Sequence, residues 1–536
     1  MRKELYQLLA QLLNSHRIRV NEAELKLQLQ SHPSYPSLHA LTGVLNHFGI
    51  TNLALQVPVQ ADVLPELPDY FIANLMGAKE KQLMLVAKQQ NRWEIFDDTD
   101  KVQLLDQASF LQRWDGIILA VEKEETALTE AKDEPSFFST KILFVGLFLL
   151  MAYFIAIQGN LFASLHFLLS IIGFAFSVLI VQHELGFTSP TTDRFCQQSE
   201  KTSCDDVLLS KGAKILNFLK LSDLSIVIFG SYILYWTFYF LTTALPITLI
   251  VLLSWSAIPV VLYSLYYQRW VVQKWCPLCL AIAGVLVLQA VSVFTSDFSF
   301  AMLSLSLKTG LIFLFSTLIA IGTWKTVKDL LAQKKELGAL KLKHFKFKRN
   351  FSIFQALHQR GESLNASIDI PQEIVLGAFD APLEIILVTN PRCFYCKEAH
   401  QDISKVLKSA SDQLKLIIRF NFREIDQEDI GYQVAAQLLH IFATQGKSAV
   451  EKALDEVYHA EVALPTWLAQ QTGNTKNAYE SSLRTQAEWC RTHGINFTPA
   501  LFVAGKQFPV EYDRGDLIYF VEELIEQNEI DVVLSD

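Results

Sequence analysis

Cysteine is missing from the first 195 residues of this chain, and charged residues are scarce along all 536. Only seven cysteines occur, too few for a scaffold held together by disulfides, so their positions matter more than their number. Charged residues make up 19% and hydrophobic residues 51%, with a mean hydropathy of +0.24. This composition excludes a disordered, collagen-like or disulfide-rich secreted chain. The formal charge of −9 provides no basic surface for nucleic acid.

A long middle region has almost no charge. From Phe137 to Thr323 there are six windows of about 20 nearly uncharged residues, each long enough to cross the hydrocarbon core of a bilayer as a helix. A buried soluble core is the alternative, but soluble helices rarely stay apolar on every face over this length. We therefore predict an integral, multi-pass membrane protein that does not open with a secretory signal. The expected spans are 137–157, 163–182, 222–243, 246–267, 277–296 and 303–323.

More polar regions flank these windows. Residues 1–125 combine a helical leucine stripe with strand-like runs, which indicates a small soluble domain, and the acidic stretch 122–134 is typical of a linker. Residues 325–349 carry nine Lys or Arg and two acidic residues, with Leu and Phe interleaved. This pattern favours a basic amphipathic helix on an anionic membrane surface, with a plain charged linker as the alternative. The predicted regions are 1–125, 137–323, 325–349 and an α/β domain at 370–536.

Six of the seven cysteines form three close pairs, and an even number of spans would place all seven on one side of the membrane. Cys393 and Cys396 form a CxxC between a predicted strand and a predicted helix. The N-terminus of that helix stabilises a thiolate at Cys393, which makes Cys393 the attacking sulfur. A zinc site would need two further ligands, and no second CxxC or histidine pair is available. We predict redox chemistry and no metal.

The other two pairs belong to the membrane region. Cys276 and Cys279 form a CxxC where a charged connector gives way to an uncharged helix, and Cys196 and Cys204 lie in a polar loop between two spans. A dithiol at the membrane boundary can exchange with protein thiols. It can also reduce a quinone, because a dithiol donates two electrons and a quinone accepts two. Structural cysteines in a packed helix and a static disulfide across the loop are the alternatives. Two CxxC pairs on the same side favour a loop that exchanges disulfides.

The C-terminal region resembles a known fold. A Thr498-Pro499 pair precedes the predicted strand 500–504, about a hundred residues after the CxxC. This order resembles the thioredoxin-like fold of the DsbA type. The resemblance implies that Pro499 is cis and lies against the CxxC, and that Thr498 offers backbone hydrogen bonds to a bound peptide.

The membrane region resembles the vitamin K epoxide reductase family, and more narrowly its bacterial members fused to a thioredoxin-like domain. The resemblance covers roughly 160–536 and is carried by two runs: Cys196-x7-Cys204-Asp-Asp-Val-Leu-Leu-Ser210 and Trp275-Cys-Pro-Leu-Cys279. It implies a four-helix bundle around a quinone that Cys279 faces, with Cys276 as its partner. It also implies that Cys204 exchanges with Cys276, that Cys196 meets the thioredoxin-like domain and that Ser210 supports the loop site.

The N-terminal region resembles the papain-like peptidase C39 family in four segments: Ser34-Tyr-Pro-Ser-Leu-His39, Phe48-Gly49, Trp93-Glu-Ile-Phe-Asp97 and Trp114-Asp-Gly116. A cysteine protease needs a thiolate and an imidazole. No cysteine precedes Cys196, and Gln82 takes the expected histidine position, which leaves Asp97 or Asp98 as the remaining acid. We predict an inactive α+β domain that binds peptides or acts as a scaffold. Three histidines here are expected to be solvated rather than metal-bound: His32, His39 and His47.

Together these patterns predict a helical transmembrane bundle between an α+β papain-like domain and an α/β thioredoxin-like domain. The predicted function is a quinone-dependent thiol oxidase that makes disulfides in secreted cysteine-containing proteins, with ubiquinone or menaquinone as acceptor. Our alignment puts Ile226 where vertebrate enzymes have a ligand-binding asparagine, which disfavours vitamin K epoxide. The alternatives are a peptide-binding export or maturation factor with an accessory thiol-redox module and an outward conduit of reducing equivalents.

The predicted location is the bacterial inner membrane, with the redox domains facing the periplasm or exterior. The positive-inside rule points the other way, because Lys and Arg crowd the side of the cysteines. Stable disulfide formation needs an oxidising compartment, however, and large domains can translocate largely regardless of charge.

Overall fold

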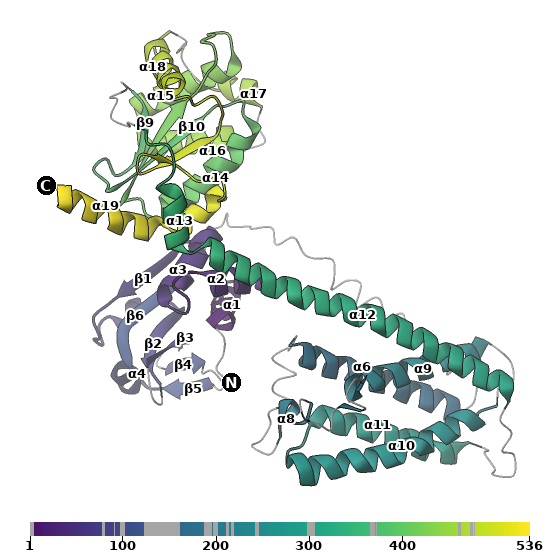
Figure 1. The fold of residues 1–536 in the computed structure, drawn as a ribbon. Coiled ribbons are helices and arrows are strands. Elements are labelled where there is room, and N and C mark those ends of the chain that lie inside the picture. The colour runs from purple at the N-terminus through teal and green to yellow at the C-terminus, as the bar shows by residue number, and fades with distance from the viewer. Residues whose placement is uncertain are drawn as a thin grey trace. The chain divides into compact units, whose positions relative to one another are not determined.

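The computed structural model divides the chain into two compact units, one formed by Met1–Lys132 with Leu340–Asp536 and the other by Asp133–Ala339 (Figure 1). The first unit holds two sheet-containing domains, and the second holds a bundle of apolar helices. The structure describes residues 5–77, 81–89, 92–96, 102–122, 161–186, 196, 202–208, 210, 214–215, 219–241, 246–296, 306–364, 370, 372–458, 463–471, 475 and 477–535.

The N-terminal domain packs three helices on an antiparallel six-stranded sheet of order β1-β6-β2-β3-β4-β5. The side chains of Asn21 and Ser37 accept hydrogen bonds from the first N–H groups of α2 and α3, so they fix where these helices begin. Leucines of the helices bury against one side of the sheet, and an aromatic cluster fills the other. This arrangement confirms the predicted α+β class. The elements are α1 (Leu5–Ser15), α2 (Glu22–Ser31), α3 (Leu38–His47), β1 (Asn52–Gln56), η1 (Leu64–Glu66), β2 (Tyr70–Met76), β3 (Lys81–Gln89), β4 (Arg92–Phe96), β5 (Val102–Leu105), α4 (Gln107–Arg113) and β6 (Trp114–Val121).

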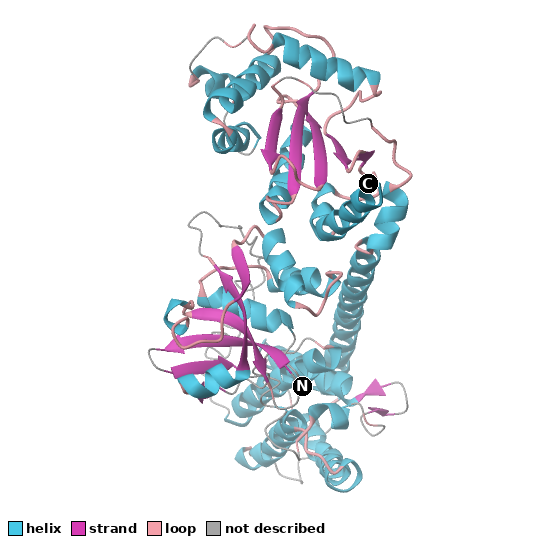
Figure 2. Cartoon of the chain, turned by 90° about the vertical axis from the view of Figure 1, so that its left-hand side faces the viewer, coloured by secondary structure: helices cyan, strands magenta, loops and turns pink. Residues whose placement is uncertain are grey.

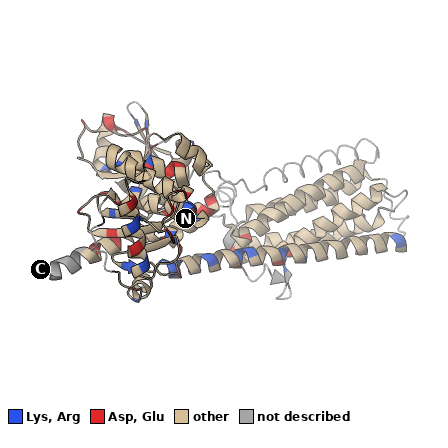
Figure 3. Cartoon of the chain, turned by 90° about the horizontal axis from the view of Figure 1, so that it is seen from above, with Lys and Arg blue, Asp and Glu red and all other residues tan. Residues whose placement is uncertain are grey.

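Five described helices are long and apolar enough to cross a membrane. Figure 3 shows how few charged residues the bundle helices carry, whereas Lys and Arg recur along the later part of α12. Five of the six predicted spans therefore coincide with helices, and the sixth, 137–157, lies outside the described residues. The elements are α6 (Leu161–Leu185), α8 (Cys204–Leu208), β7 (Lys214–Ile215), β8 (Leu219–Lys220), α9 (Leu221–Leu241), α10 (Thr248–Tyr266), η3 (Tyr267–Val272), α11 (Pro277–Ser292), η4 (Val293–Thr295) and α12 (Leu307–Lys348).

Close packing in the bundle depends on a glycine and on paired polar groups. A Cβ at Gly173 of α6 would lie 2.3 Å from the ring of Phe229 on α9, so a larger residue would push these helices apart. The ring of His166 joins three helices, with its Nε2 3.0 Å from Ser254 Oγ and its Nδ1 accepting from Trp236 Nε1 at 2.9 Å. These hydrogen bonds satisfy polar groups that water could not reach in a bilayer.

The basic region 325–349 is not a separate helix, because α12 continues through it without a break. Its 42 residues have a length of about 60 Å at 1.5 Å per residue, about twice the thickness of the hydrocarbon core. The helix is fixed to α9 through Asp223, which accepts from Trp324 Nε1 at 3.0 Å and from Lys328 Nζ at 2.6 Å. Residues 325–339 therefore extend the direction of the preceding apolar segment.

The C-terminal domain has a five-stranded sheet of order β13-β12-β10-β11-β9 with helices packed around it (Figure 2). Strands β10 and β11 are parallel and the other pairings are antiparallel. The chain enters α14 directly after β10, which confirms the predicted thioredoxin-like α/β class. The elements are α13 (Phe351–His358), β9 (Ile374–Gly377), β10 (Leu383–Thr389), α14 (Phe394–Ser409), β11 (Leu414–Phe420), α15 (Ile430–Gln445), α16 (Lys447–Tyr458), α17 (Leu464–Ala469), α18 (Glu480–Thr492), β12 (Ala500–Val503), β13 (Lys506–Gln507), η6 (Arg514–Tyr519) and α19 (Val521–Ser535).

Arg349 follows α12 and contacts both domains of the first unit. Its buried guanidinium donates to the side chains of Gln28 and Ser31, and its central carbon lies 3.7 Å from the ring centroid of Tyr519. His32 packs edge-on against the same tyrosine ring. The expectation that His32 is solvated is therefore wrong: the side chain is buried, and burial lowers its pKa to about 3.

Candidate redox centres

The Cys393–Cys396 pair lies where β10 passes into α14. Cys393 is the N-cap residue of α14, and its N–H donates to the carbonyl of Asn390 at 2.9 Å. The peptide bond between Thr498 and Pro499 is cis, and the Cys393 thiol donates to the carbonyl of Thr498 at 3.3 Å. The structure thus brings together the residues that the sequence predicted for this site.

The two thiols of this pair differ in protonation. Partial burial by itself would raise the pKa of Cys393, but hydrogen bonds to its sulfur from Thr498, from Cys396 and from N–H groups of the first helical turn lower it overall. Burial raises the pKa of Cys396 to about 11, although a hydrogen bond from Thr389 opposes this shift. Because the thiolate is the nucleophile, the lowered pKa favours Cys393 over Cys396 as the attacking sulfur.

Exposed aromatic side chains surround Cys393. Phe394 is 78% exposed, Tyr395 68% and Phe497 48%. Apolar side chains that stay in water beside a reactive group mark an interaction surface. This surface suits an extended peptide with apolar residues near a cysteine.

The second pair begins α11 in the bundle. Cys276 is the N-cap residue, and its sulfur accepts a hydrogen bond from the N–H of Cys279 at 3.3 Å. The N–H of Cys276 donates to Gln268 Oε1 at 2.9 Å. Cys276 is fully buried, whereas Cys279 is partly exposed. Sequence reasoning missed Gln268, because only the π-helical turn η3 brings its amide to the start of α11.

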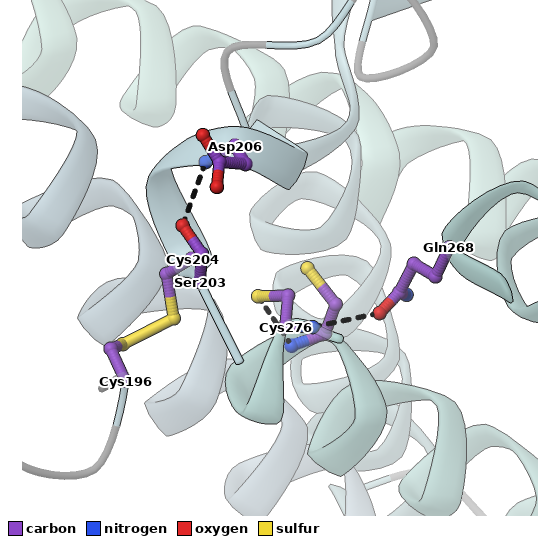
Figure 4. Close-up of a disulfide and its surroundings, with 7 residues drawn as sticks. Cys196, Ser203, Cys204, Asp206, Gln268 and Cys276 are labelled. Atoms are coloured by element: carbon purple, nitrogen blue, oxygen red, sulfur yellow. Dashed lines mark hydrogen bonds between the residues drawn. A yellow bond between two sulfur atoms is a disulfide. The ribbon is translucent and has the colours of Figure 1, made fainter. Parts of the chain in front are cut away.

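The loop pair is oxidised and lies beside the membrane pair. Cys196 and Cys204 form a disulfide with 5.5 Å between their Cα atoms, while Cys276 is a free thiol. Thr202 forms a β-bridge with Trp275, and this bridge holds the loop next to the residue that precedes Cys276. Both loop cysteines and Cys276 belong to one buried cluster, and Figure 4 shows Cys204 on α8 facing the start of α11.

Ser210 lies just after α8. Its hydroxyl donates to the carbonyl of Val207 at 2.7 Å and thereby closes the last turn of the helix that carries Cys204. It also lines a largely apolar cavity that Cys279 shares with the paired side chains of Glu184 and Lys220.

An apolar cavity of about 90 Å³ lies beside Cys279 and shares part of its wall with the first cavity. Residues of α6, α8, α9, α10 and α11 line it, and its few polar groups include the hydroxyls of Ser222, Ser225 and Ser264. Ile226, expected at the ligand position, instead lines a different cavity between α6, α9 and α12. The hydroxyls of Ser222 and Ser225 donate to Glu184 and to the Ser222 carbonyl. Ser264 therefore supplies the hydroxyl donor of the wall beside Cys279. An apolar wall with such a donor beside a thiol fits a quinone, whose ring is apolar and whose two oxygens accept hydrogen bonds.

The remaining candidates give simpler results. Cys490 is fully buried in α18, and burial raises its pKa to about 12, so this thiol is unreactive at neutral pH. Gln82 lies on β3 opposite Leu75, while Asp97 and Asp98 lie outside the described residues. Within the described chain, no group of three or more His, Cys, Asp or Glu side chains could hold a metal ion.

The fold and these dithiols define a membrane-embedded thiol oxidoreductase with a thioredoxin-like domain. Residues 164–294 match the vitamin K epoxide reductase family, residues 369–521 match a thioredoxin family and residues 6–126 match the peptidase C39 family. The chain therefore matches models of these three families in the order that the sequence predicted. No curated protein matches it.

Several solved structures are similar to single domains of the chain. A periplasmic thioredoxin-like protein from Salmonella enterica serovar Typhimurium is 19% identical with a TM-score of 0.25, and the match covers 32% of this chain and 97% of that one. Oxidised BdbD from Bacillus subtilis is 17% identical with a TM-score of 0.24, covering 31% and 98%. The peptidase domain of Streptococcus ComA, a bi-functional ABC transporter, is 16% identical with a TM-score of 0.21, covering 23% and 93%.

Proposed function

We propose that this chain is a quinone-dependent thiol oxidase that makes disulfides in exported proteins. The observation that carries the proposal is the position of Cys279, between Cys276 and an apolar cavity inside the helical bundle. A dithiol buried away from water next to such a cavity can transfer electrons to a lipid-soluble acceptor. The buried disulfide Cys196–Cys204 next to Cys276 supports a second exchange partner on the opposite side.

The proposed path begins at the thioredoxin-like domain. A substrate thiolate attacks the Cys393–Cys396 disulfide at Cys393, and a second substrate thiol then displaces Cys393, so the substrate is oxidised and the CxxC reduced. Cys393 next attacks the loop disulfide at Cys196, and Cys396 resolves the mixed disulfide. The loop dithiol that remains reduces the disulfide form of the membrane CxxC.

Within the bundle, Cys204 attacks Cys276, and Cys196 closes the loop disulfide again. Cys276 and Cys279 are then both thiols, as they are in this structure. Cys279 and Cys276 would then give two electrons and two protons to a quinone held in the apolar cavity, and the Cys276–Cys279 disulfide would form again. Ser264 would hold a quinone oxygen beside Cys279, and Ile228, Phe229 and Leu286 would exclude water from its ring.

Topology supports one compartment for all three pairs. The loop pair follows α6, and the membrane CxxC precedes α11, so both lie at the same end of the bundle. Because α11 leads away from that end, α12 begins at the other end and returns residues 325–348 to the first. We propose that this end faces the periplasm or exterior of a bacterial inner membrane, where disulfides are stable.

The N-terminal domain is proposed to bind the peptide substrate without cleaving it. The sequence has no cysteine before Cys196, so this domain lacks the nucleophile that a C39 peptidase needs. Its edge strand β1 exposes Leu53 and Leu55, at 55% and 42%, to which an extended chain could pair.

The test is a stoichiometry measured on the full chain in lipid with a quinone and a reduced peptide dithiol. We expect one quinol per peptide disulfide. Cys279→Ser should abolish quinol formation while disulfide exchange at Cys393 continues, because only Cys279 lines the cavity among the six paired cysteines. Cys490→Ala is the matched control, since Cys490 is buried away from both dithiols, and it should keep the wild-type stoichiometry.

Two outcomes would overturn the proposal. Quinol production that persists in Cys279→Ser would remove Cys279 as the final donor. Peptide oxidation or reduction with no quinol at all would favour an outward conduit of reducing equivalents. A domain 1–125 deletion that lowers peptide affinity alone would separate the binding role from the redox role.

A further inference from the structure

A buried polar cluster lies behind Cys396, and the exchange steps described above do not use it. Thr389 ends β10, His400 follows Cys396 by one turn of α14, and Tyr458 ends α16. His400 Nε2 lies 3.0 Å from Thr389 Oγ1, and the Thr389 hydroxyl donates to the hydroxyl oxygen of Tyr458 at 3.1 Å. The rings of His400 and Tyr458 stack with 3.7 Å between their centroids. All four side chains are buried.

Cys396 needs a group that removes its proton. As its sulfur is buried, only a small fraction of this thiol is ionised at neutral pH, yet Cys396 must attack as a thiolate to resolve a mixed disulfide on Cys393. Thr389 forms a hydrogen bond with that sulfur. A hydroxyl can accept one proton while it donates its own, and a neutral imidazole can accept the proton donated.

The ring of His400 also reaches a cavity. This cavity of about 330 Å³ lies between the sheet and helices α14 and α16, which is room for several water molecules. Besides His400, its titratable wall residues are Lys408 of α14 and Glu451 and Asp455 of α16. The imidazole therefore has the Thr389 hydroxyl on one side and a polar route toward solvent on the other.

We propose that Thr389 and His400 form a proton relay for Cys396, and that the cavity beside His400 exchanges the relayed proton with water. The inference rests on the proposed exchange role of Cys393 and Cys396. Thr389 touches the reacting sulfur, and His400 acts through Thr389 as a positioning residue and proton store.

The relay works in both directions. When Cys393 holds a mixed disulfide, the Thr389 hydroxyl turns from Tyr458 to His400 Nε2. The Cys396 thiol gives its proton to Thr389 Oγ1, and the Thr389 proton passes to His400 Nε2. The Cys396 thiolate attacks Cys393 Sγ, the Cys393–Cys396 bond forms, and the partner sulfur leaves with the electron pair as a thiolate. His400 then gives its proton to water. When a substrate thiolate instead opens the Cys393–Cys396 disulfide, Cys396 leaves as the thiolate and takes the proton back.

A chromogenic aromatic disulfide separates the two sulfurs. The test uses the reduced full chain in lipid, with the five cysteines other than Cys393 and Cys396 replaced by serine or alanine. The first chromophore is released when Cys393 attacks, and the second when Cys396 resolves the mixed disulfide. Both rates are followed between about pH 5 and pH 10, a range that spans the ordinary pKa values of imidazole and thiol.

We expect His400→Gln to slow the second release by about 100-fold at pH 7 and to leave the first release unchanged. The slowing of the second release should become smaller as pH rises, because hydroxide then removes the Cys396 proton in place of the relay. Thr389→Val should have the same effect, and Thr389→Ser, which keeps the hydroxyl, should restore the second rate. His440→Gln is the matched control, because His440 lies on α15 against Tyr479 rather than against Thr389.

Each contrary result has its own meaning. An unchanged second release in His400→Gln and Thr389→Val would overturn the relay while leaving the oxidase proposal intact. Equal slowing of both releases at every pH would show that these residues only support the fold, which also overturns it. Absence of the first release in the chain that carries both cysteines would instead contradict the assignment of Cys393 in the proposed function.

Discussion

The two CxxC pairs of this chain begin their helices in the same way but expose opposite cysteines. Cys393 and Cys276 are both N-cap residues, of α14 and α11. In the thioredoxin-like domain the first cysteine is accessible and Cys396 is buried, whereas in the bundle the first cysteine is buried and Cys279 lines a cavity. One local geometry therefore serves two kinds of partner.

The difference teaches what each environment requires. A protein substrate approaches from water, so the reactive sulfur has to lie at the surface among exposed aromatic side chains, as Cys393 does. In the bundle, Cys276 faces another cysteine pair of the same chain, and Cys279, three residues on, faces the apolar side. Pro277 suits the first position of α11, because proline has no N–H that would be left unpaired at a helix start.

Selective labelling should give the largest contrast between the pairs. In the reduced protein in lipid, an anionic thiol reagent should label Cys393 at least about 100-fold faster than Cys279, because a charged reagent would have to enter an apolar cavity. A neutral, lipid-soluble maleimide should label both, and Cys276 should resist both reagents. Mass spectrometry of the labelled peptides measures the ratio. Fast labelling of Cys279 by the anionic reagent would mean that water fills the cavity.

The pH profile of Cys393 is expected to give a smaller contrast. Its alkylation rate should reach half its maximum below the usual pH for a thiol, because hydrogen bonds outweigh partial burial and lower the pKa of Cys393. The reduced domain is thus stabilised by this thiolate at high pH, and that stabilisation is lost as pH falls through the lowered pKa.

Thr498→Val tests the cause of this shift, because it removes the side-chain hydrogen bond and leaves the carbonyl and the following proline. We expect the midpoint to rise and the rate at pH 7 to fall several-fold. Thr498→Ser, which keeps the hydroxyl, is the control. An unchanged midpoint in the valine variant would assign the shift to the Cys396 thiol and the N–H groups of the first helical turn.

The sequence was sufficient for features that depend on local pattern. Long apolar windows predicted four helices to within a few residues and the start of α12, which continues 25 residues beyond its window, and the CxxC spacing predicted both helix starts. The absence of proline from residues 307–348 could also have predicted that α12 is continuous. Contacts across the fold were beyond reach: the amide of Gln268 on Cys276, the ring of His400 on Thr389 and the burial of His32.

The position of Ile226 shows why the sequence alone could not predict such contacts. One residue along a helix turns a side chain by about 100 degrees, so an alignment shifted by one position moves it to another face. Ser225 lines the cavity at Cys279, while the adjacent Ile226 lines the cavity toward α12. The sequence alone could name the helix but not which of its faces meets Cys279.

The smallest expected effect concerns how the two N-cap cysteines are held. The N–H of Cys393 donates to a backbone carbonyl, whereas the N–H of Cys276 donates to the side chain of Gln268. Only the bundle site can therefore be disturbed by removing one amide. Gln268→Leu should lower the free energy of unfolding of the bundle by about 1–3 kcal/mol, because a buried N–H loses its acceptor.

The measurement is thermal unfolding of the full chain in lipid or detergent, together with the alkylation rate of Cys393. Gln182→Leu makes the same change at an exposed position of α6 and should leave the midpoint nearly unchanged. The rate at Cys393 should stay the same in both variants, because its own N–H bond is untouched. If Gln268→Leu is as stable as the control, another group accepts the hydrogen bond from the Cys276 N–H. The N-cap N–H of the bundle CxxC would then depend on a single side chain no more than that of Cys393 does.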